Sequence, residues 1–397
     1  QASCLYFVSF RLQAAGLLDT EKNQSCTNHS AASPAFWSVL LLLGCLYLFL
    51  VGIGGMGASF KLFGNDVSQN LIEATASPIT GLFIGILATA LVQSSSTTTS
   101  MVVAVVAAGG LTLQGAIPII MGANIGTAVT CTLVSLGHIG QKNEFRRAFA
   151  AACLHDWFNL LAVAILFPLE LVTGILSRLA TVLSDVFANA GGLQLANPLK
   201  VMTEPAVATL STLVGGQPIL LLLLSVALMV GMLICLVKLL RILIEARIKA
   251  MLDDYIFRNA ATAMGVGLVF TLLVQSSSVT TSLMIPLAAT GVLSLAQVFP
   301  YVIGANFGTT CTAMLAAMAT GNPAAVTVAF AHFLFNISGA LCIWPWPKVR
   351  AIPVRLAEWL ADKAMGNRLV PIVFILVVFV IVPLIFTWGR FREAFAG

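Results

Sequence analysis

The side chains best suited to bind a ligand are a carboxamide and a row of hydroxyls, and the chain carries this set twice. Residues 91–100 read LVQSSSTTTS and residues 273–282 read LVQSSSVTTS, so the two copies differ only at Thr97 and Val279. A match of this kind within one chain indicates an internal repeat. Both copies lie between long apolar runs, where polar groups are costly unless something binds them. The pattern predicts a polar cavity at membrane depth.

A structural role for these hydroxyls is the alternative. Ser and Thr can donate to carbonyl groups of their own helix, and small residues are common where membrane helices pack closely. Such a role would explain one or two serines. It would not explain a glutamine and a long row of hydroxyls in both copies, and we therefore favour a binding role.

A second repeated motif follows each polar segment. Residues 122–127 read GANIGT and residues 304–309 read GANFGT, at the same separation in sequence as the two QSSS motifs. Glycine on both sides of the asparagine predicts that the backbone unwinds here and frees carbonyl and N–H groups for ligands, while Asn and Thr add side-chain oxygens. Further on, LHDWFN at residues 154–159 corresponds to AHFLFN at residues 331–336, and the loop before the second of these is shorter.

The composition places these motifs in a membrane. The 397 residues are 59% hydrophobic and 9% charged, and their mean hydropathy is +1.00, which together indicate a multi-pass protein of the cell membrane, embedded in the lipid bilayer. The net charge of +5 comes from Lys and Arg in a few loops, which indicates membrane orientation and no nucleic-acid partner. The cysteine spacing predicts neither a metal site nor a disulfide framework, and no cofactor is expected.

The elements that must position the motifs follow from the lengths of the apolar segments. Residues 36–56 are long enough for a spanning helix, whereas the apolar run at residues 79–92 is much shorter and leads directly into the first QSSS. That length predicts half a crossing or a re-entrant hairpin. Gly109, Gly110 and Pro118 interrupt the next apolar segment, and interrupted segments in matching places of two halves are typical of transporter sites.

Three pairs of equivalent loops differ in charge. One loop of each pair contains more Lys and Arg than its counterpart in the other half. The more basic loops are residues 140–147, 241–258 and 346–368, and their counterparts are residues 320–323, 59–78 and 170–215, in the same order. Because Lys and Arg accumulate on the cytoplasmic side, the two halves should have opposite orientations. The predicted fold class is an all-α polytopic membrane protein with two inverted-topology repeats, re-entrant hairpins and broken helices.

The predicted organisation comprises a tail, two repeats, a connector and a final segment. These are an N-terminal tail (residues 1–35), a first repeat (36–169), an external connector (170–215), a second repeat (216–345), and an interfacial stretch with a final transmembrane helix (346–397). Within them, residues 218–237 and residues 370–386 are also predicted to span the membrane.

Several motifs of the chain resemble those of the type II sodium-phosphate cotransporter family, which has vertebrate and bacterial members. They are QSSS, GANIGT, EFRRAF at residues 144–149, LHDWFN, and HFLFNISG at residues 332–339, and the likeness runs from about residue 36 to 388. The resemblance implies sodium-driven uptake of inorganic phosphate, with sodium as a co-substrate and each QSSS at a hairpin tip. The chain lacks the long loop that vertebrate members carry between the halves, so it looks like a bacterial-type member. It also departs from vertebrate members at His138 and Gln141.

The resemblance further implies which residues bind the ions. Phosphate would lie between two groups of serines, Ser94, Ser95 and Ser96 in the first half and Ser276, Ser277 and Ser278 in the second. One sodium ion would use Gln275, Ser276, Thr309 and Thr312, and another would lie near Thr132, Asp156 and Asn159. Because sodium is a hard cation that prefers oxygen ligands, Gln93, Asn124 and Asn306 complete the predicted sodium-binding set.

Asp156 is predicted separately, from the cost of burying its charge. An ionised carboxylate at membrane depth is costly unless it is paired, and no Lys or Arg lies in the same apolar segment, so a bound cation is the expected partner. The alternative is an Asp that is protonated or satisfied by Asn or Thr on a neighbouring helix. Family members with Asp at the matching position are electrogenic, with a third sodium ion beside divalent phosphate, whereas those with Gly are electroneutral. The resemblance therefore implies electrogenic transport.

Two other classes of protein share some of these features. A hydrolase is disfavoured, because His155 and Asp156 are neighbours that point about 100° apart on a helix and the chain has no G-x-S-x-G motif. Each His is expected to be a packed, hydrogen-bonded helix residue. A channel is the remaining alternative function, since hydroxyl-lined hairpins could also line a pore. The sequence also leaves open whether the unit is a monomer or a homodimer.

Overall fold

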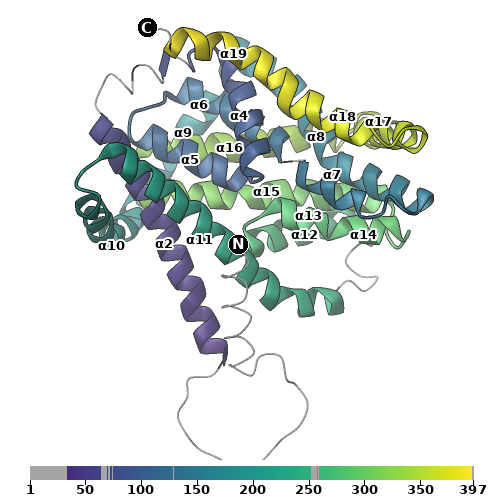
Figure 1. The fold of residues 1–397 in the computed structure, drawn as a ribbon, viewed down its shortest axis with the longest axis horizontal. Coiled ribbons are helices and arrows are strands. Elements are labelled where there is room, and N and C mark those ends of the chain that lie inside the picture. The colour runs from purple at the N-terminus through teal and green to yellow at the C-terminus, as the bar shows by residue number, and fades with distance from the viewer. Residues whose placement is uncertain are drawn as a thin grey trace, which may run out of the picture.

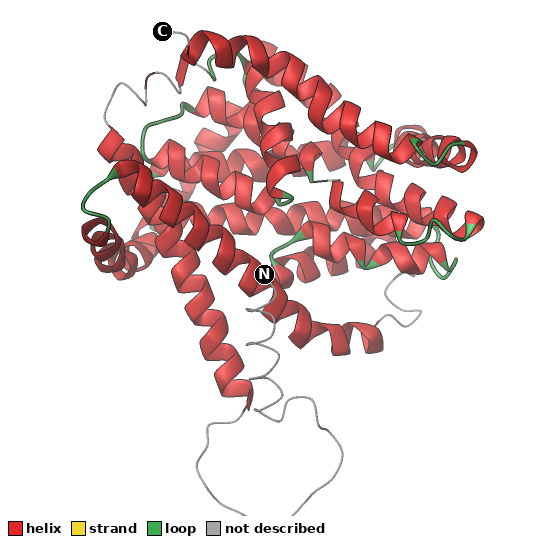
Figure 2. Cartoon of the chain, in the orientation of Figure 1, coloured by secondary structure: helices red, strands yellow, loops and turns green. Residues whose placement is uncertain are grey.

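Seven helices in the described part of the chain are long and apolar enough to cross a membrane. The computed structural model describes residues 34–395, apart from residues 64–68, 70–71, 74, 128, 252–256 and 258. The described residues form helices joined by loops and turns, with no strand among them (Figure 2). The protein is thus an all-α polytopic membrane protein, as predicted. Nearly all of the predicted tail, residues 1–35, lies outside the described range.

The first half begins with α2 (Pro34–Phe63), which contains the predicted spanning segment and extends beyond it. The other helices are α4 (Pro78–Val92), α5 (Ser95–Ala107), α6 (Leu113–Gly126), α7 (Val129–Leu136) and α8 (Lys142–Thr173). Gly109 adopts a left-handed φ of 82° between α5 and α6, so the predicted interruption is present there. Pro118 lies inside α6 and does not end it.

The second half repeats this order of elements. It contains α11 (Pro218–Met251), α12 (Ala260–Val274), α13 (Ser277–Ser282), α14 (Met284–Ala289), α15 (Leu295–Thr320) and α16 (Pro323–Ile343). α17 (Pro347–Gly366) follows, and the chain continues through α18 (Val370–Leu376), a π-helical segment η1 (Val377–Ile381) and α19 (Val382–Phe395). The predicted spanning segments, residues 218–237 and 370–386, are confirmed as helical and apolar enough to span.

The segment between the halves is helical. It consists of the end of α8, then α9 (Ile175–Asn189) and α10 (Gly192–Leu213). α9 packs against α16, and α10 packs against α2 and α15. The connector therefore belongs to the packed bundle of helices, which the sequence did not indicate, while its external position stays a prediction.

The two halves are inverted relative to each other, as the contact between the equivalent helices α2 and α11 shows (Figure 1). A Cβ at Gly52 would lie 2.8 Å from Met229, and a Cβ at Gly55 would lie 2.3 Å from the Ser225 hydroxyl. The contact moves forward along α2 as it moves backward along α11, so the helices run antiparallel. Small residues allow this close approach of two apolar helices.

Two helical hairpins carry the repeated QSSS motifs. α4 and α5 are joined at Gln93, which has a φ of 59°, and α12 and α13 are joined at Gln275, which has a φ of 57°. These are the only non-glycine residues with positive φ in the described backbone. A left-handed conformation costs an L-residue roughly 1–2 kcal/mol, so both turns are held by their surroundings. The predicted hairpins are confirmed.

The predicted unwinding is wrong for the second GANxGT motif, because α15 continues unbroken through residues 304–309. In the first motif α6 ends at Gly126, so a break in the helix occurs there, at the end of the motif. The glycines instead allow helices to touch backbone to backbone: a Cβ at Gly122 would lie 1.9 Å from the Leu82 carbonyl oxygen, and one at Gly304 would lie 2.0 Å from that of Met264. In each half the GANxGT helix therefore packs directly against the first helix of the hairpin.

Single cysteines at Asn143 and Ala324 are expected to react with an impermeant maleimide from opposite sides of the membrane. Both residues are exposed and lie in the first turns of α8 and α16, which are equivalent helices of the two inverted halves. Labelling before and after permeabilisation, in a chain whose native cysteines are replaced, measures sidedness. The native Asn322 is unsuitable, because its side chain caps α16. Labelling of both sites from one side would contradict the inverted topology.

Candidate functional site

The tips of the two hairpins meet. The hydroxyl of Ser96 donates to the backbone carbonyl of Gln275 over 3.3 Å, which links the first QSSS directly to the second. The structure therefore brings the two predicted groups of serines to one place, although the motifs are far apart in sequence. Their roles as phosphate ligands stay predictions.

The first serine of each group caps a helix. The Ser94 hydroxyl oxygen accepts from the backbone N–H of Thr97 at 3.2 Å, and the Ser276 hydroxyl oxygen accepts from that of Val279 at 3.4 Å. These are N-cap interactions, which fix where α5 and α13 begin.

Three serines that come after the N-caps have hydroxyls that are free to donate. Ser95, Ser277 and Ser278 are 3%, 3% and 5% exposed, and no hydrogen-bond partner of their hydroxyls occurs among the described residues. Hydroxyls without a protein partner on largely buried residues are free to donate to a ligand that accepts hydrogen bonds. In α5 the unpaired N–H groups of the first turn add partial positive charge beside Ser95.

The threonines that follow have the structural role that the sequence left open. Thr99 donates to the carbonyl of Ser95 at 2.9 Å, and Thr281 donates to that of Ser277 at 2.7 Å. Such bonds satisfy the hydroxyl within its own helix. The polar segment is thus divided into tip serines, of which Ser95, Ser277 and Ser278 lack partners among the described residues, and threonines behind them that bond within their own helix.

Each glutamine of the motif holds its amide in a fixed orientation. The side-chain nitrogens of Gln93 and Gln275 donate to the carbonyls of Ala90 and Leu272 in their own hairpins. Their side-chain oxygens accept from threonine hydroxyls, Gln93 from Thr130 at 3.0 Å and Gln275 from Thr312 at 2.6 Å. The sequence assignment included Thr312 and missed Thr130, although Thr130 stands at the matching position of the first repeat.

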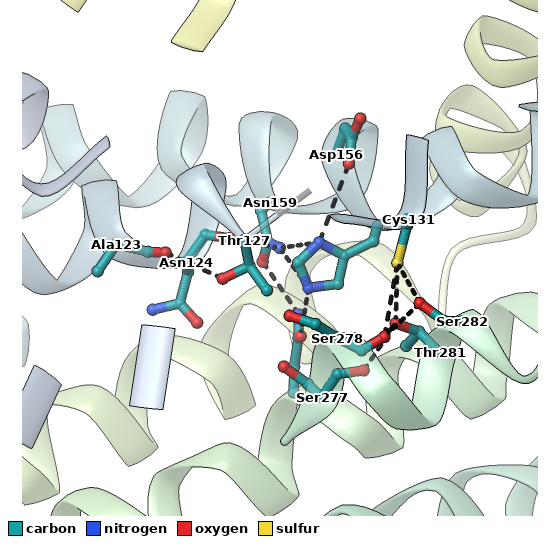
Figure 3. Close-up of polar contacts among 12 residues, drawn as sticks. Ala123, Asn124, Thr127, Cys131, Asp156, Asn159, Ser277, Ser278, Thr281 and Ser282 are labelled. Atoms are coloured by element: carbon teal, nitrogen blue, oxygen red, sulfur yellow. Dashed lines mark hydrogen bonds and ion pairs between the residues drawn. The ribbon is translucent and has the colours of Figure 1, made fainter. Parts of the chain in front are cut away.

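A network of His and Asn side chains joins the two halves (Figure 3). Nε2 of His155 lies 2.8 Å from Oδ1 of Asn306, whose Nδ2 donates to Oδ1 of Asn159 at 3.0 Å. Nδ2 of Asn159 donates in turn to the backbone carbonyl of Asn124 at 3.2 Å. The predicted sodium ligands Asn159 and Asn306 therefore already use their oxygens for contacts between the halves, and the part that His155 plays was missed from sequence.

The symmetry-related network is looser. Nε2 of His332 lies 3.4 Å from Oδ1 of Asn124, and Asn336 donates to the backbone carbonyl of Asn306 at 3.2 Å. Nδ2 of Asn124 donates to Ile120 in its own helix, and Oδ1 of Asn336 has no partner among the described residues. The packed, hydrogen-bonded role in a helix is confirmed for His155 and His332, although the two copies are not equally satisfied. It is wrong for His138, which is partly exposed in the turn after α7, and His29 lies outside the described residues.

Asp156 lies apart from the serines. In Figure 3 the Asp156 side chain lies away from Ser277 and Ser278. Asp156 is fully buried, and neither carboxylate oxygen has a hydrogen-bond partner in the described part of the chain; Nδ1 of His155 is 4.0 Å away. The hydroxyl of Thr132 on the neighbouring α7 is also buried without a partner in that part of the chain. Two such oxygen-bearing groups suit a hard cation.

The remaining predicted residues contribute less directly. The hydroxyl of Thr309 donates to the carbonyl of Ala305 at 3.1 Å, within α15. Gln141 lies just before α8, and Nδ1 of His138 contacts Oε2 of Glu144 at 3.3 Å. Because α8 rises about 1.5 Å per residue, Gln141 is roughly 22 Å along the helix from Asp156. These two departures from the vertebrate pattern therefore do not touch the Asp156 region.

These features define a polytopic membrane protein of two inverted repeats whose re-entrant hairpins meet at a buried polar site. Comparison of the sequence with known proteins identifies its relatives. The chain belongs to the Na+/Pi-cotransporter family, whose profile matches residues 48–174 and 227–344. The family expected from the motifs is thereby confirmed, while the bacterial-type assignment and the repeat boundaries stay predictions.

Several mammalian proteins are similar to the chain. The sodium-dependent phosphate transport protein 2A of Ovis aries is 34% identical over 425 residues, which cover 87% of this chain and 66% of the relative. The 2A protein of Rattus norvegicus is also 34% identical with the same coverage, and the 2B protein of Homo sapiens is 32% identical over 87% of this chain and 64% of its own length. The chain thus spans slightly less than two thirds of these relatives. No solved structure matches it.

Proposed function

We propose that this chain is a secondary active transporter that couples inward sodium flux to uptake of inorganic phosphate as HPO₄²⁻. The observation that carries the proposal is the meeting of the two QSSS tips, where the largely buried residues Ser95, Ser277 and Ser278 present hydroxyls without partners among the described residues. The names of the relatives, sodium-dependent phosphate transport proteins, support the same pair of ions. We propose no catalytic activity and no cofactor.

Phosphate would be held by neutral donors. The free serine hydroxyls and the first-turn N–H groups of α5 can donate to its oxygens. No Lys or Arg occurs among the buried side chains of the described residues, so this part of the protein offers no buried positive charge to offset the cost of desolvating a dianion. Sodium ions bound nearby would supply that charge. This requirement gives a physical reason for coupling the two fluxes.

Sodium would be held by oxygens at two places. The carboxamide oxygens of Gln93 and Gln275 and the hydroxyls of Thr130 and Thr312 lie at the hairpin turns, beside the serines. Asp156 offers a buried carboxylate that lies away from Ser277 and Ser278. Two sodium ions balance HPO₄²⁻, and a third at Asp156 would make each transport cycle carry one net positive charge inward.

Replacing either free serine is expected to weaken phosphate uptake. Removing one buried donor to a charged ligand costs roughly 1–3 kcal/mol, so Ser95→Ala and Ser277→Ala should each raise KM for phosphate by about 5- to 150-fold. Ser282→Ala is the matched control, because that hydroxyl donates within its own helix to the carbonyl of Ser278. Elution of the variants as folded, monodisperse protein shows that the fold is intact. A normal KM in either variant would mean that its hairpin is scaffolding only.

Uptake of labelled phosphate into proteoliposomes tests the proposed function. We expect saturable uptake that requires an inward sodium gradient and stops when potassium replaces sodium. The channel alternative makes a different prediction, namely a phosphate current that is linear with voltage and independent of sodium. Observation of such a current, or of no phosphate movement under any gradient, would refute cotransport.

A further inference from the structure

An apolar cavity of about 440 Å³ lies between α8, α17 and the last spanning helix. Its walls come from three segments: Trp157 on α8, Trp359 on α17, and Val373, Phe374 and Val378 on α18 and η1. The volume is within the range of roughly 300–1,000 Å³ that is typical of small-molecule sites. Trp359 and Val373 are 53% exposed on the membrane-facing surface, so the cavity can be entered from the lipid.

Two local features distinguish this cavity from an ordinary gap between helices. The helix that forms one wall contains the π-helical segment η1 (Val377–Ile381), a rare geometry that is frequent at functional sites. The indole N–H of Trp157 is buried and has no hydrogen-bond partner among the described residues. Because the walls are almost entirely apolar, the part of a ligand that fills this cavity should be apolar as well.

Basic residues flank the cavity on one side. Arg355, Trp359 and Lys363 follow one another at every fourth position of α17, so they lie along one helical stripe. Arg368 follows between two residues that line the cavity. No ion pair involves Arg355, Lys363 or Arg368 in the described part of the chain.

α17 carries two acidic residues, Glu358 and Asp362, and Asp362 is already paired. Oδ1 of Asp362 lies 2.5 Å from Nε of Arg146, and this hydrogen bond lowers the pKa of the Asp362 carboxyl. The opposite face of α17 packs against α8 through small and apolar residues such as Ala357, Ala361 and Ala364. α17 thus has the character of an interfacial amphipathic helix that presents cations to lipid headgroups.

We propose that this cavity binds one anionic glycerophospholipid of the surrounding membrane. One acyl chain lies between Trp157, Phe374 and Val378, and the phosphate lies against Lys363 and Arg368. The proposal concerns a surface of the protein separate from the hairpin tips, and it stands whether or not the chain transports phosphate. A second copy of the chain packed on this surface is the competing occupant.

Lipid binding by the purified full chain tests the proposal. Native mass spectrometry in a neutral detergent, with phosphatidylglycerol, phosphatidylcholine or inorganic phosphate added in turn, measures retention of each ligand. Two basic side chains near an anionic headgroup should favour phosphatidylglycerol over phosphatidylcholine by about tenfold or more. Lys363→Gln combined with Arg368→Gln should abolish that preference. Arg178→Gln, on the exposed surface of α9, is the control for the loss of a basic side chain elsewhere and should leave the preference unchanged.

A cavity-filling change separates the acyl chain from the headgroup. Val373→Trp should reduce retention of both phospholipids, because the larger ring occupies the apolar space. Equal retention of the two lipids by the wild-type chain, or an undiminished preference in the charge variant, would overturn the proposal. So would a Val373→Trp protein that retains lipid normally or changes only its oligomeric state. Should that variant not fold, the charge variant and its control decide the question alone.

Discussion

Asp156→Gly is expected to abolish the response of phosphate uptake to membrane potential while retaining part of the sodium-dependent uptake. The wild-type carboxylate is fully buried and has no hydrogen-bond partner among the described residues, so a bound sodium ion is its natural counter-charge. Two sodium ions neutralise HPO₄²⁻, and only the third makes the cycle carry charge. Removing the carboxylate removes that third ion, because an uncharged site cannot offset the dehydration of sodium at this depth.

The measurement is uptake into proteoliposomes at several imposed potentials, with wild type and variant side by side. An inside-negative potential should accelerate wild-type uptake and leave Asp156→Gly unaffected. Asp156→Asn preserves the size of the side chain and should behave like Asp156→Gly, which assigns the effect to charge. Asp185→Asn, which removes an exposed carboxylate on α9, should behave like wild type. Wild-type uptake that ignores the potential, or an equal response in Asp156→Gly, would exclude a third sodium ion at this residue.

Gly267→Ala is expected to destabilise the second hairpin strongly and to eliminate transport. A Cβ at residue 267 would lie 2.2 Å from the Tyr301 carbonyl oxygen, and neither backbone can move without separating α12 from α15. The same two helices hold Gln275 against Thr312 over 2.6 Å, so separation would also open the hairpin turn. Overpacking of this kind typically costs about 1–3 kcal/mol and costs more against backbone atoms, so a loss of about 3 kcal/mol or more is expected.

Gly265→Ala provides the control on the same helix. Residue 265 is exposed, and an added Cβ there would meet nothing within 4 Å. Alanine favours helix over glycine by about 1 kcal/mol, so this change should preserve or raise the thermal midpoint in detergent. A fluorescence-detected melting curve for the two variants measures the difference. Equal midpoints would mean that the close contact between α12 and α15 relaxes without cost.

The sequence predicts the hairpins and the paired polar tips because both depend on local information. The apolar segment at residues 79–92, which ends in QSSS, is too short to cross the membrane, and the constant separation between repeated motifs identifies its partner. The same separation would also have paired Thr130 with Thr312. The separate roles of the serines and threonines were not predictable, because every one of these hydroxyls can bond to its own helix.

The glycine motifs and the His–Asn network depend on contacts that a single sequence does not contain. Glycine beside Asn is compatible with an unwound turn or with a close helix crossing, and only the Leu82 and Met264 carbonyls decide between them. His155 is far from Asn306 in sequence, and His332 is farther still from Asn124. Side chains at such separations are brought together by the inversion of the two halves, which the pattern of charged loops indicates only coarsely.

The unequal His–Asn networks make the interface between the two halves stronger on one side than on the other. Nε2 of His155 and Oδ1 of Asn306 are 2.8 Å apart, whereas Oδ1 of Asn336 is left without a donor among the described residues, at a cost of roughly 1–3 kcal/mol. Nε2 of His332 and Oδ1 of Asn124 are 3.4 Å apart, so the bond that corresponds to the His155 contact is also longer. The side of the interface around His332 and Asn336 is therefore held by weaker contacts than the side around His155.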